Sequence, residues 1–172
     1  MIWVLAIAGM VVALFGLTVL VGAPFVPSLR RDIAALFDEL SIGPDDIVLD
    51  IGSGDGVVLA VAAARGAQAV GVEINPLLVL WSHWRTRRYG RQVQLRWSNA
   101  RRMRPLAKVT VMYCFGAGPF VDDIARIARR QAVAQRAPLT LVSYGFSIPD
   151  MQPQRVGPYF VYAVPSDGHT NT

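Results

Sequence analysis

A glycine-rich segment and one downstream glutamate are the residues whose types and spacing best fit ligand chemistry. Residues 50–56 read Asp-Ile-Gly-Ser-Gly-Asp-Gly, between an apolar run that predicts a strand (47–51) and an alanine- and valine-rich run that predicts a helix (57–65). Glycines let the backbone approach a ligand, and a helix N-terminus offers N–H donors. Glu73 ends the next predicted strand, 19 residues after Gly54, where a carboxylate can accept both hydroxyl protons of a ribose. The pattern predicts a site for a nucleoside-containing cofactor.

Two cofactor classes, dinucleotides and S-adenosylmethionine, compete for this pattern. A dinucleotide fingerprint reads Gly-x-Gly-x-x-Gly, but Val57 stands three residues after Gly54 and the third glycine is Gly56. Asp50, just before the loop, would repel a pyrophosphate and suits a cofactor that carries an α-amino group. Residues 30–172 also leave no room for a separate hydride-acceptor domain. These points favour S-adenosylmethionine over NAD, which stays as the alternative.

The elements that must position these residues alternate along the chain. Strands are predicted at 47–51, 69–73, 92–97, 109–115, 139–146 and 159–164, with a short segment near 154–156, and helices at 57–65, 76–89 and 119–136. Such alternation is typical of an α/β fold with a doubly wound, mostly parallel sheet. Its ligand is expected at the carboxyl edge of the first strands.

Three segments carry a resemblance to a known family. The Asp-Ile-Gly-Ser-Gly-Asp-Gly loop, Glu-Ile-Asn-Pro at 73–76 and Pro-Phe-Val-Pro at 24–27 resemble class I, seven-strand methyltransferases. They resemble more closely the membrane-anchored protein-lysine methyltransferases of mitochondria and their archaeal soluble relatives. The resemblance covers residues 24–164. It implies a seven-strand, Rossmann-like sheet, S-adenosylmethionine as the cofactor and a protein lysine as the methyl acceptor.

The resemblance also implies roles for individual residues. Those expected to bind the cofactor are Asp50, Gly52, Ser53 and Gly54 at the methionine end, Glu73 at the ribose, and Asn99 and Ala100 at the adenine edge. Those expected to line the substrate entrance are Phe25, Val26, Pro27 and Ser28. The sequence departs from the family where Asn99 replaces the frequent aspartate. An amide oxygen can still accept a hydrogen bond from the exocyclic amine of adenine.

Methyl transfer from a sulfonium requires a positioned, uncharged nucleophile and the exclusion of water. A dry aromatic pocket favours loss of the lysine proton, because burial penalises the charged form. The aromatic residues near strand ends that could form this pocket are Tyr113, Phe115, Tyr144, Phe146 and Phe160. Tyr144 and Phe115 are the predicted catalytic residues. Cys114 sits within an apolar strand and is interpreted as structural, and the two histidines have no pattern that predicts a metal site.

The N-terminal segment differs in composition from the rest of the chain. All 29 charged residues of this 172-residue chain lie after residue 29. Residues 2–23 are uncharged and as a helix would reach about 33 Å, enough to cross a bilayer core of about 30 Å. A cleaved signal peptide is the alternative. Arg30 and Arg31 follow the run, which predicts a cytoplasmic C-terminal domain at a bacterial inner membrane. The predicted organisation is an anchor (2–23), a connector with a helix (24–45), a methyltransferase domain (46–166) and a tail (167–172).

A basic stretch is the last feature with a possible partner. Nine arginine and lysine side chains and no acid lie between Arg85 and Lys108, interleaved with tryptophans. A solvated face and contact with anionic lipid are the main interpretations, and nucleic acid is disfavoured because no RNA-binding module is visible. The sequence thus predicts a protein-lysine N-methyltransferase that acts on a membrane protein. Methylation of a lipid or small molecule, or a non-catalytic S-adenosylmethionine-binding module tethered to the membrane, are the alternatives.

Overall fold

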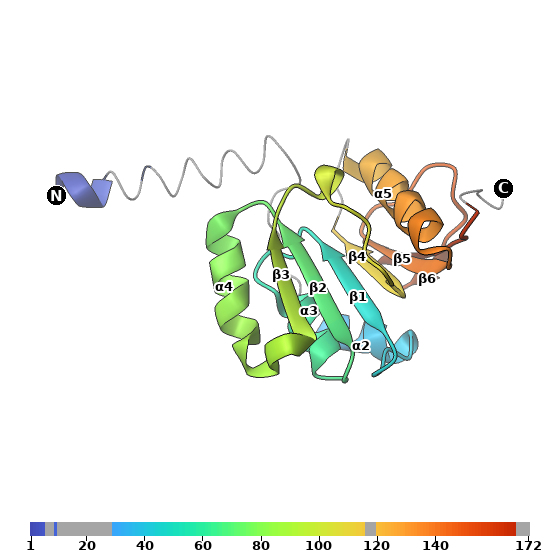
Figure 1. The fold of residues 1–172 in the computed structure, drawn as a ribbon, viewed down its shortest axis with the longest axis horizontal. Helices are drawn as coiled ribbons and strands as arrows, with labels where there is room; N and C mark the ends of the chain where they lie inside the picture. Colours follow the sequence, from blue (N-terminus) through green and yellow to red (C-terminus); the bar gives the residue numbers. More distant parts are fainter. Residues whose placement is uncertain (6–8, 10–28, 116–119, 168–172) are drawn as a thin grey trace.

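The computed structural model describes residues 1–5, 9, 29–115 and 120–167. A seven-stranded sheet runs through the middle of the domain (Figure 1), in the order β3-β2-β1-β4-β5-β7-β6. The strands are β1 (Ile47–Ile51), β2 (Gln68–Glu73), β3 (Val93–Trp97), β4 (Val111–Cys114), β5 (Leu139–Tyr144), β6 (Gln154–Val156) and β7 (Tyr159–Val164). The helices are α2 (Arg30–Glu39), α3 (Val57–Ala63), α4 (Pro76–Thr86) and α5 (Phe120–Gln135), with the short 3₁₀ helices η1 (Arg87–Gln92) and η2 (Ala100–Arg102).

The strand directions bring the ligand-binding segments to one edge. Strands β1 to β5 pair in parallel, whereas β7 runs antiparallel between β5 and β6. The carboxyl ends of the five parallel strands therefore meet at one edge, together with the start of β7. The predicted doubly wound, mostly parallel seven-strand sheet is confirmed.

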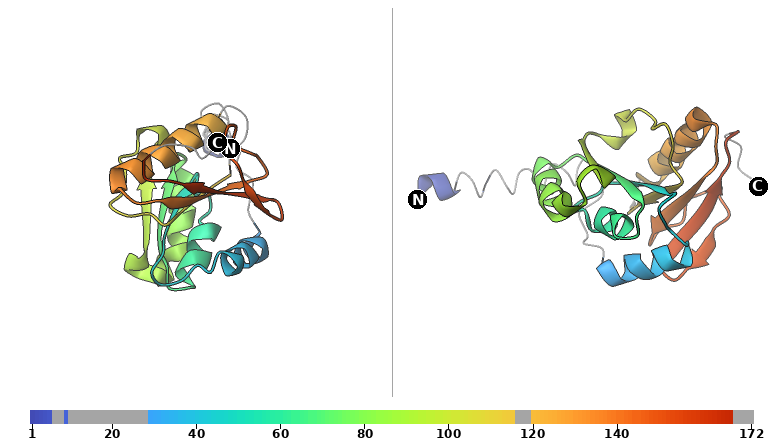
Figure 2. Two further views of the ribbon diagram at one scale, coloured as in Figure 1. Left: turned by 90° about the vertical axis from the view of Figure 1, so that its right-hand side faces the viewer. Right: turned by 60° about the horizontal axis from the view of Figure 1, so that its bottom comes forward.

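Helices cover both faces of the sheet (Figure 2). Helices α2 and α3 pack on one face around a core that includes Ile33, Phe37 and Val58. Helix α5 packs on the other face around a second core that includes Ile124 and Leu141. The buried strands have apolar side chains on both faces, which is why they read as continuous apolar runs in the sequence.

No helix among the described residues is long and apolar enough to cross a membrane. The expected anchor at residues 2–23 lies mainly outside those residues, as does the expected substrate entrance, Phe25, Val26, Pro27 and Ser28. The tail beyond residue 167 lies outside them too.

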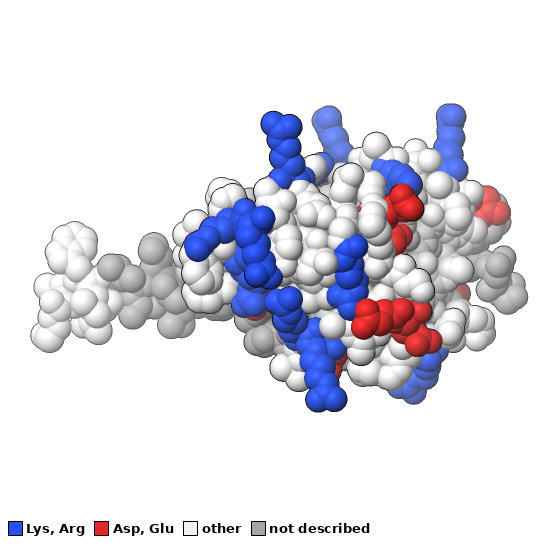
Figure 3. All heavy atoms as spheres, turned by 90° about the horizontal axis from the view of Figure 1, so that it is seen from below, with Lys and Arg blue, Asp and Glu red and all other residues white. Residues whose placement is uncertain are grey.

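The basic stretch reaches two opposite edges of the sheet. Helix η1 precedes β3, at the amino ends of the parallel strands, and exposes Arg87, Arg88 and Arg91. Helix η2 follows β3 and lies at the carboxyl ends. Seen from the side of η1, lysine and arginine side chains gather toward the N-terminal side of the molecule, while acidic side chains lie nearer the centre and the far side (Figure 3).

Candidate active site

The glycine-rich loop is fastened to the end of β2 by hydrogen bonds. The backbone N–H groups of Gly52 and Ser53 donate to the carbonyl of Val72 at 2.9 and 3.1 Å. The N–H of Gly54 donates to Glu73 Oε2 at 3.0 Å. Glu73 Oε1 accepts two more N–H groups, from Ile74 and the residue after it, each at 2.8 Å. The carboxylate that was predicted to bind ribose is thus oriented by three backbone donors.

Two glycines of the site are required for different physical reasons. Gly52 has a φ of +76°, and a Cβ added there would meet no atom within 4 Å. It therefore borders open space at the carboxyl edge, as a residue beneath a ligand must. Gly71 on β2 has no such freedom, because an added Cβ would lie 2.7 Å from Ser53 Oγ. This close packing seats the loop on β2 and buries the Ser53 side chain.

Asp50 is a buried carboxyl group in an acidic environment. It is 2% exposed, one residue before the end of β1. Burial first, and then the carboxylates of Glu73 and Asp55, raise the pKa of Asp50 well above its ordinary value. A ligand ammonium beside these carboxylates would stabilise the ionised form of Asp50, whereas a pyrophosphate would be repelled. The electrostatics therefore fit the cationic methionine end of S-adenosylmethionine better than a dinucleotide.

Replacement of Asp50 by asparagine should separate stability from cofactor binding. The folded state holds the Asp50 proton more tightly than the unfolded chain does. The contribution of Asp50 to the free energy of unfolding is therefore greatest at low pH, and it falls as the pH rises from the unfolded pKa through the folded pKa. We expect Asp50→Asn to reduce this fall and to raise the melting temperature at neutral pH. Its affinity for S-adenosylmethionine should drop by about tenfold or more, because a charge-assisted contact is lost.

Thermal denaturation between pH 4 and 8, with calorimetric titration of S-adenosylmethionine, checks both effects. The paired Asp45→Asn variant changes an acid at a distant turn and should alter neither quantity. Unchanged cofactor affinity in Asp50→Asn would contradict the role of Asp50.

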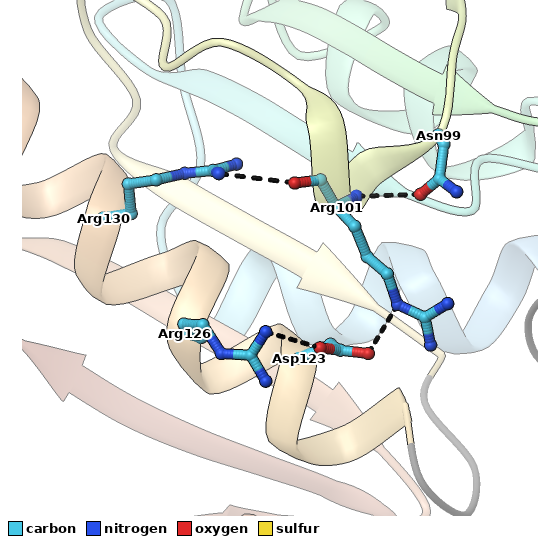
Figure 4. Close-up of polar contacts among 5 residues, drawn as sticks. All are labelled: Asn99, Arg101, Asp123, Arg126 and Arg130. Atoms are coloured by element: carbon cyan, nitrogen blue, oxygen red, sulfur yellow. Dashed lines mark hydrogen bonds and ion pairs between the residues drawn. The ribbon is translucent and has the colours of Figure 1, made fainter.

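The predicted adenine edge is held by a polar network that joins η2 to α5 (Figure 4). Asn99 Oδ1 accepts the N–H of Arg101 at 2.9 Å, which caps η2. Arg101 Nε donates to Asp123 Oδ2 at 2.6 Å, and Asp123 also pairs with Arg126 at 2.9 Å. Arg130 donates to the carbonyl of Arg101 at 3.3 Å. Because one lone pair of the Asn99 oxygen is used in the cap, adenine has only the second lone pair or the amide N–H groups to bind.

An aromatic cluster forms at the ends of β4 and β5 and the start of β7. The rings of Phe115 and Tyr144 lie 5.4 Å apart, and Phe146 lies 6.3 Å from Phe115. Tyr159 continues the cluster, 5.2 Å from Tyr144 and 6.4 Å from Tyr113. Tyr113 stands directly beside Asp50 in the register of β4 and β1. The structure thus brings the two predicted catalytic residues together, near the acidic loop.

One predicted pocket residue lies elsewhere and one member of the cluster was missed. Phe160 packs against the core on the α5 face and has the Arg155 guanidinium 4.7 Å from its ring centre. Its neighbour Tyr159 points to the opposite face and joins the cluster instead, because successive strand residues alternate between faces. Burial raises the pKa of Tyr159 to about 12, so its phenol stays protonated at neutral pH.

Cys114 is a structural residue, as predicted. It is buried, and its Sγ lies 3.4 Å from the carbonyl of Val142, to which the thiol donates. Burial raises the pKa of its thiol to about 12, so a thiolate nucleophile does not form there at neutral pH.

Comparisons with known proteins place this geometry in a family. The model of the ANTKMT methyltransferase domain matches residues 50–155, which include the loop, Glu73, η2 and every member of the aromatic cluster except Tyr159. The chain is similar to the ATP synthase c-subunit lysine N-methyltransferase of Xenopus laevis, with 43% identity over 67 residues, 39% of this chain and 29% of that protein. It is also similar to a protein-lysine N-methyltransferase of Saccharolobus islandicus, with 39% identity over 54 residues, 30% of this chain and 34% of that protein. The matched segments span about a third or less of these curated relatives.

Solved structures share the fold at lower identity. An RNA methyltransferase of Salinibacter ruber, in complex with S-adenosyl-L-homocysteine, superposes with a TM-score of 0.68 at 22% identity, over 81% of this chain and 92% of that chain. A SAM-dependent methyltransferase of Geobacter sulfurreducens gives a TM-score of 0.58 at 21% identity, over 81% of this chain and 58% of that chain. With its seven-strand sheet and its glycine loop fastened to Glu73, the chain belongs to the ANTKMT methyltransferase domain family, within the class I S-adenosylmethionine-dependent methyltransferases.

Proposed function

We propose that this chain is a protein-lysine N-methyltransferase. The observation that carries the proposal is the aromatic cluster of Phe115 and Tyr144 beside the strand that bears Asp50. This arrangement offers an acidic edge for the cofactor and apolar walls for an acceptor amine. The curated relatives, named as lysine methyltransferases, support lysine as the acceptor.

The cluster suits the deprotonation that a lysine nucleophile requires. When bound, S-adenosylmethionine supplies an activated methyl group on a sulfonium, which an uncharged amine can displace in line. A lysine ammonium has no free lone pair, so the site must favour loss of its proton. Apolar rings penalise the charged form and lower the lysine pKa. Phe115 and Tyr144 would also orient the aliphatic stem and exclude water.

Tyr144 gives the sharpest test of this wall. We expect Tyr144→Ala to lower kcat by about 10- to 100-fold, since positioning and water exclusion are lost, while the KM for S-adenosylmethionine stays within about twofold of the wild-type value. Tyr144→Phe should retain most of the activity if the ring rather than the hydroxyl forms the wall.

Phe160→Ala is the matched control, because it truncates an aromatic residue of β7 that lies on the α5 face. It should lower stability without lowering kcat. A Tyr144→Ala variant that keeps its fold and its full kcat would contradict the proposed pocket.

We further propose that the acceptor lies on a membrane protein, close to the cytoplasmic face of the bilayer. The uncharged run at 2–23, followed by Arg30 and Arg31, supports a single membrane span with the domain in the cytoplasm. Tethering would raise the effective concentration of acceptors in the same membrane.

Transfer of a tritiated methyl group tests the acceptor class. The full chain is incubated with labelled S-adenosylmethionine and a lysate of cells that lack its gene. Membrane proteins, soluble proteins, lipids and RNA are then separated. We expect the label in membrane proteins. Label confined to soluble proteins would contradict the membrane acceptor, label in lipid or RNA would contradict a protein acceptor, and cofactor binding without any transfer would indicate a non-catalytic module.

A further inference from the structure

Helix α4 carries its apolar and polar residues on unexpected sides. Its two fully buried positions are Ser82 and Thr86, which are 0% and 3% exposed. Four of its large apolar residues face outward: Leu77 is 36% exposed, Leu80 68%, Trp81 54% and Trp84 58%. Leu78 and Val79 are half-buried. A surface helix ordinarily turns its apolar stripe toward the core. The outward stripe of α4 is therefore a feature that the fold does not use.

The apolar surface continues onto the edge of the sheet. Strand β3 is the end strand, and its last residue, Trp97, is 69% exposed. A shallow groove of about 290 Å³ runs between helix and strand. The residues that line it are Pro76, Val79, Leu80, His83, Leu95 and Trp97. We call the outward stripe of α4, this groove and Trp97 the α4–β3 edge. A contiguous exposed apolar surface of this kind is typical of an interaction site.

Positive charge accompanies the tryptophans. No aspartate or glutamate occurs from Pro76 to Trp97. The Arg87 guanidinium lies 5.0 Å from the ring centre of Trp84, and Arg88 and Arg91 are exposed on the adjoining η1. Figure 3 shows basic side chains gathered on this side of the molecule. The α4–β3 edge therefore pairs indole rings with guanidinium groups.

We propose that the α4–β3 edge docks on the headgroup region of an anionic lipid bilayer. Indole rings, with an apolar body and one N–H donor, favour the membrane–water interface. Arginines next to them are attracted by anionic headgroups and find phosphate oxygens to bind. A second copy of this chain is a poorer occupant, because symmetric pairing of this edge would bring arginines of like charge together.

Docking through this edge would fix the direction in which the candidate active site opens. Trp97 pairs in register with Glu73, and its indole N–H donates to the Ile74 carbonyl at 2.9 Å. The edge therefore reaches the carboxyl end of β2, to which the glycine-rich loop is hydrogen-bonded, and it reaches η1 at the amino end of β3. With β3 facing the lipid, the candidate active site at the carboxyl edge of the sheet would open in a direction parallel to the bilayer surface. The docking proposal does not depend on which group is methylated.

Quenching of a single tryptophan by brominated lipid tests the proposal. In the full chain, Trp3, Trp81 and Trp97 are replaced by phenylalanine, so that Trp84 is the reporter. The matched reporter replaces all four tryptophans by phenylalanine and carries Val133→Trp, at a half-exposed apolar position on α5. Both chains are reconstituted in phosphatidylcholine vesicles with and without phosphatidylglycerol. We expect the emission of Trp84 to be quenched and blue-shifted with phosphatidylglycerol, and the α5 reporter to be unaffected.

The charge contribution is tested in the Trp84 reporter chain. Arg88→Gln with Arg91→Gln should weaken docking by about 10- to 30-fold, at about one kcal/mol for each basic residue near an anionic surface. The pair Lys108→Gln with Arg136→Gln removes the same charge elsewhere and should have little effect. Unquenched Trp84 in a chain with native circular dichroism would overturn the proposal. Equal quenching of both reporters would also overturn it. So would a blue shift of Trp84 emission that appears without lipid, on addition of RNA or at higher protein concentration.

Discussion

Replacement of Glu73 by alanine is expected to weaken S-adenosylmethionine binding by about 10- to 100-fold, because a charge-assisted contact to the ribose is lost. It should also lower the free energy of unfolding by about 2–4 kcal/mol. The second effect arises because the carboxylate accepts three N–H groups, from Gly54, Ile74 and Asn75, and buried donors left without partners are costly. The three hydrogen bonds show that Glu73 shapes the loop, and we expect the same carboxylate to bind the ribose.

Calorimetric titration with S-adenosylmethionine and thermal denaturation measure the two effects. Glu39→Ala is a suitable control, since Glu39 is the only other glutamate and is exposed at the end of α2. It should change neither quantity. Cofactor affinity within about twofold of wild type in a folded Glu73→Ala chain would refute the ribose role.

The second large effect is expected at Gly56. Its φ of +78° is unfavourable for any residue with a side chain, and an added Cβ would lie 2.1 Å from Ser82 Oγ. Gly56→Ala should therefore destabilise the fold by about 3–5 kcal/mol, as left-handed backbone strain and overpacking add. The clash between residue 56 and Ser82 would push α3 away from α4. It would also disturb the glycine-rich loop, because Gly56 is the last residue of that loop.

Two further variants divide this effect into its parts. Gly157 has a φ of +56° in open space, so Gly157→Ala should cost only the backbone strain, about 1–2 kcal/mol. Ser82→Gly removes the obstructing side chain, and we expect it to restore part of the stability of Gly56→Ala. Denaturant unfolding compares the variants. Equal losses for Gly56→Ala and Gly157→Ala would show that the contact with Ser82 is unimportant.

Much of the fold follows from local patterns. The strand predicted at 47–51 matches β1, because five apolar or buried residues are bounded by a turn and by glycines. The strands predicted at 69–73 and 159–164 likewise match β2 and β7 to within one residue at each end. The predicted loop and Glu73 come together as expected, since consecutive parallel strands end at the same edge.

Other features depend on contacts between distant residues and were not predictable. The helix expected over 76–89 ends at Thr86 and continues as η1, where Gly90 leaves helical geometry. Tyr159 rather than Phe160 joins the aromatic cluster, because the face on which each lies depends on the pairing register of β7 with β5. A shift of one residue would reverse the two.

The polar supports of the site were likewise beyond sequence patterns. Arg101 and Asp123 are separated by 22 positions, and nothing in their local sequence pairs them. The outward tryptophans of α4 were visible only as residues interleaved with arginines. Their exposure follows from Ser82 packing closely against Gly56, which turns the polar side of the helix inward.

Mass spectrometry of methylated residues tests the proposed activity most directly. Membranes from cells without the gene are incubated with the full chain and S-adenosylmethionine that carries a trideuterated methyl group. Digested proteins are then searched for deuterated methyl groups. We expect the label on a lysine side-chain nitrogen of a membrane protein, and its loss with Glu73→Ala. Deuterated methyl groups on lipid, RNA or other amino-acid side chains, with none on lysine, would contradict the assignment of a protein-lysine methyltransferase.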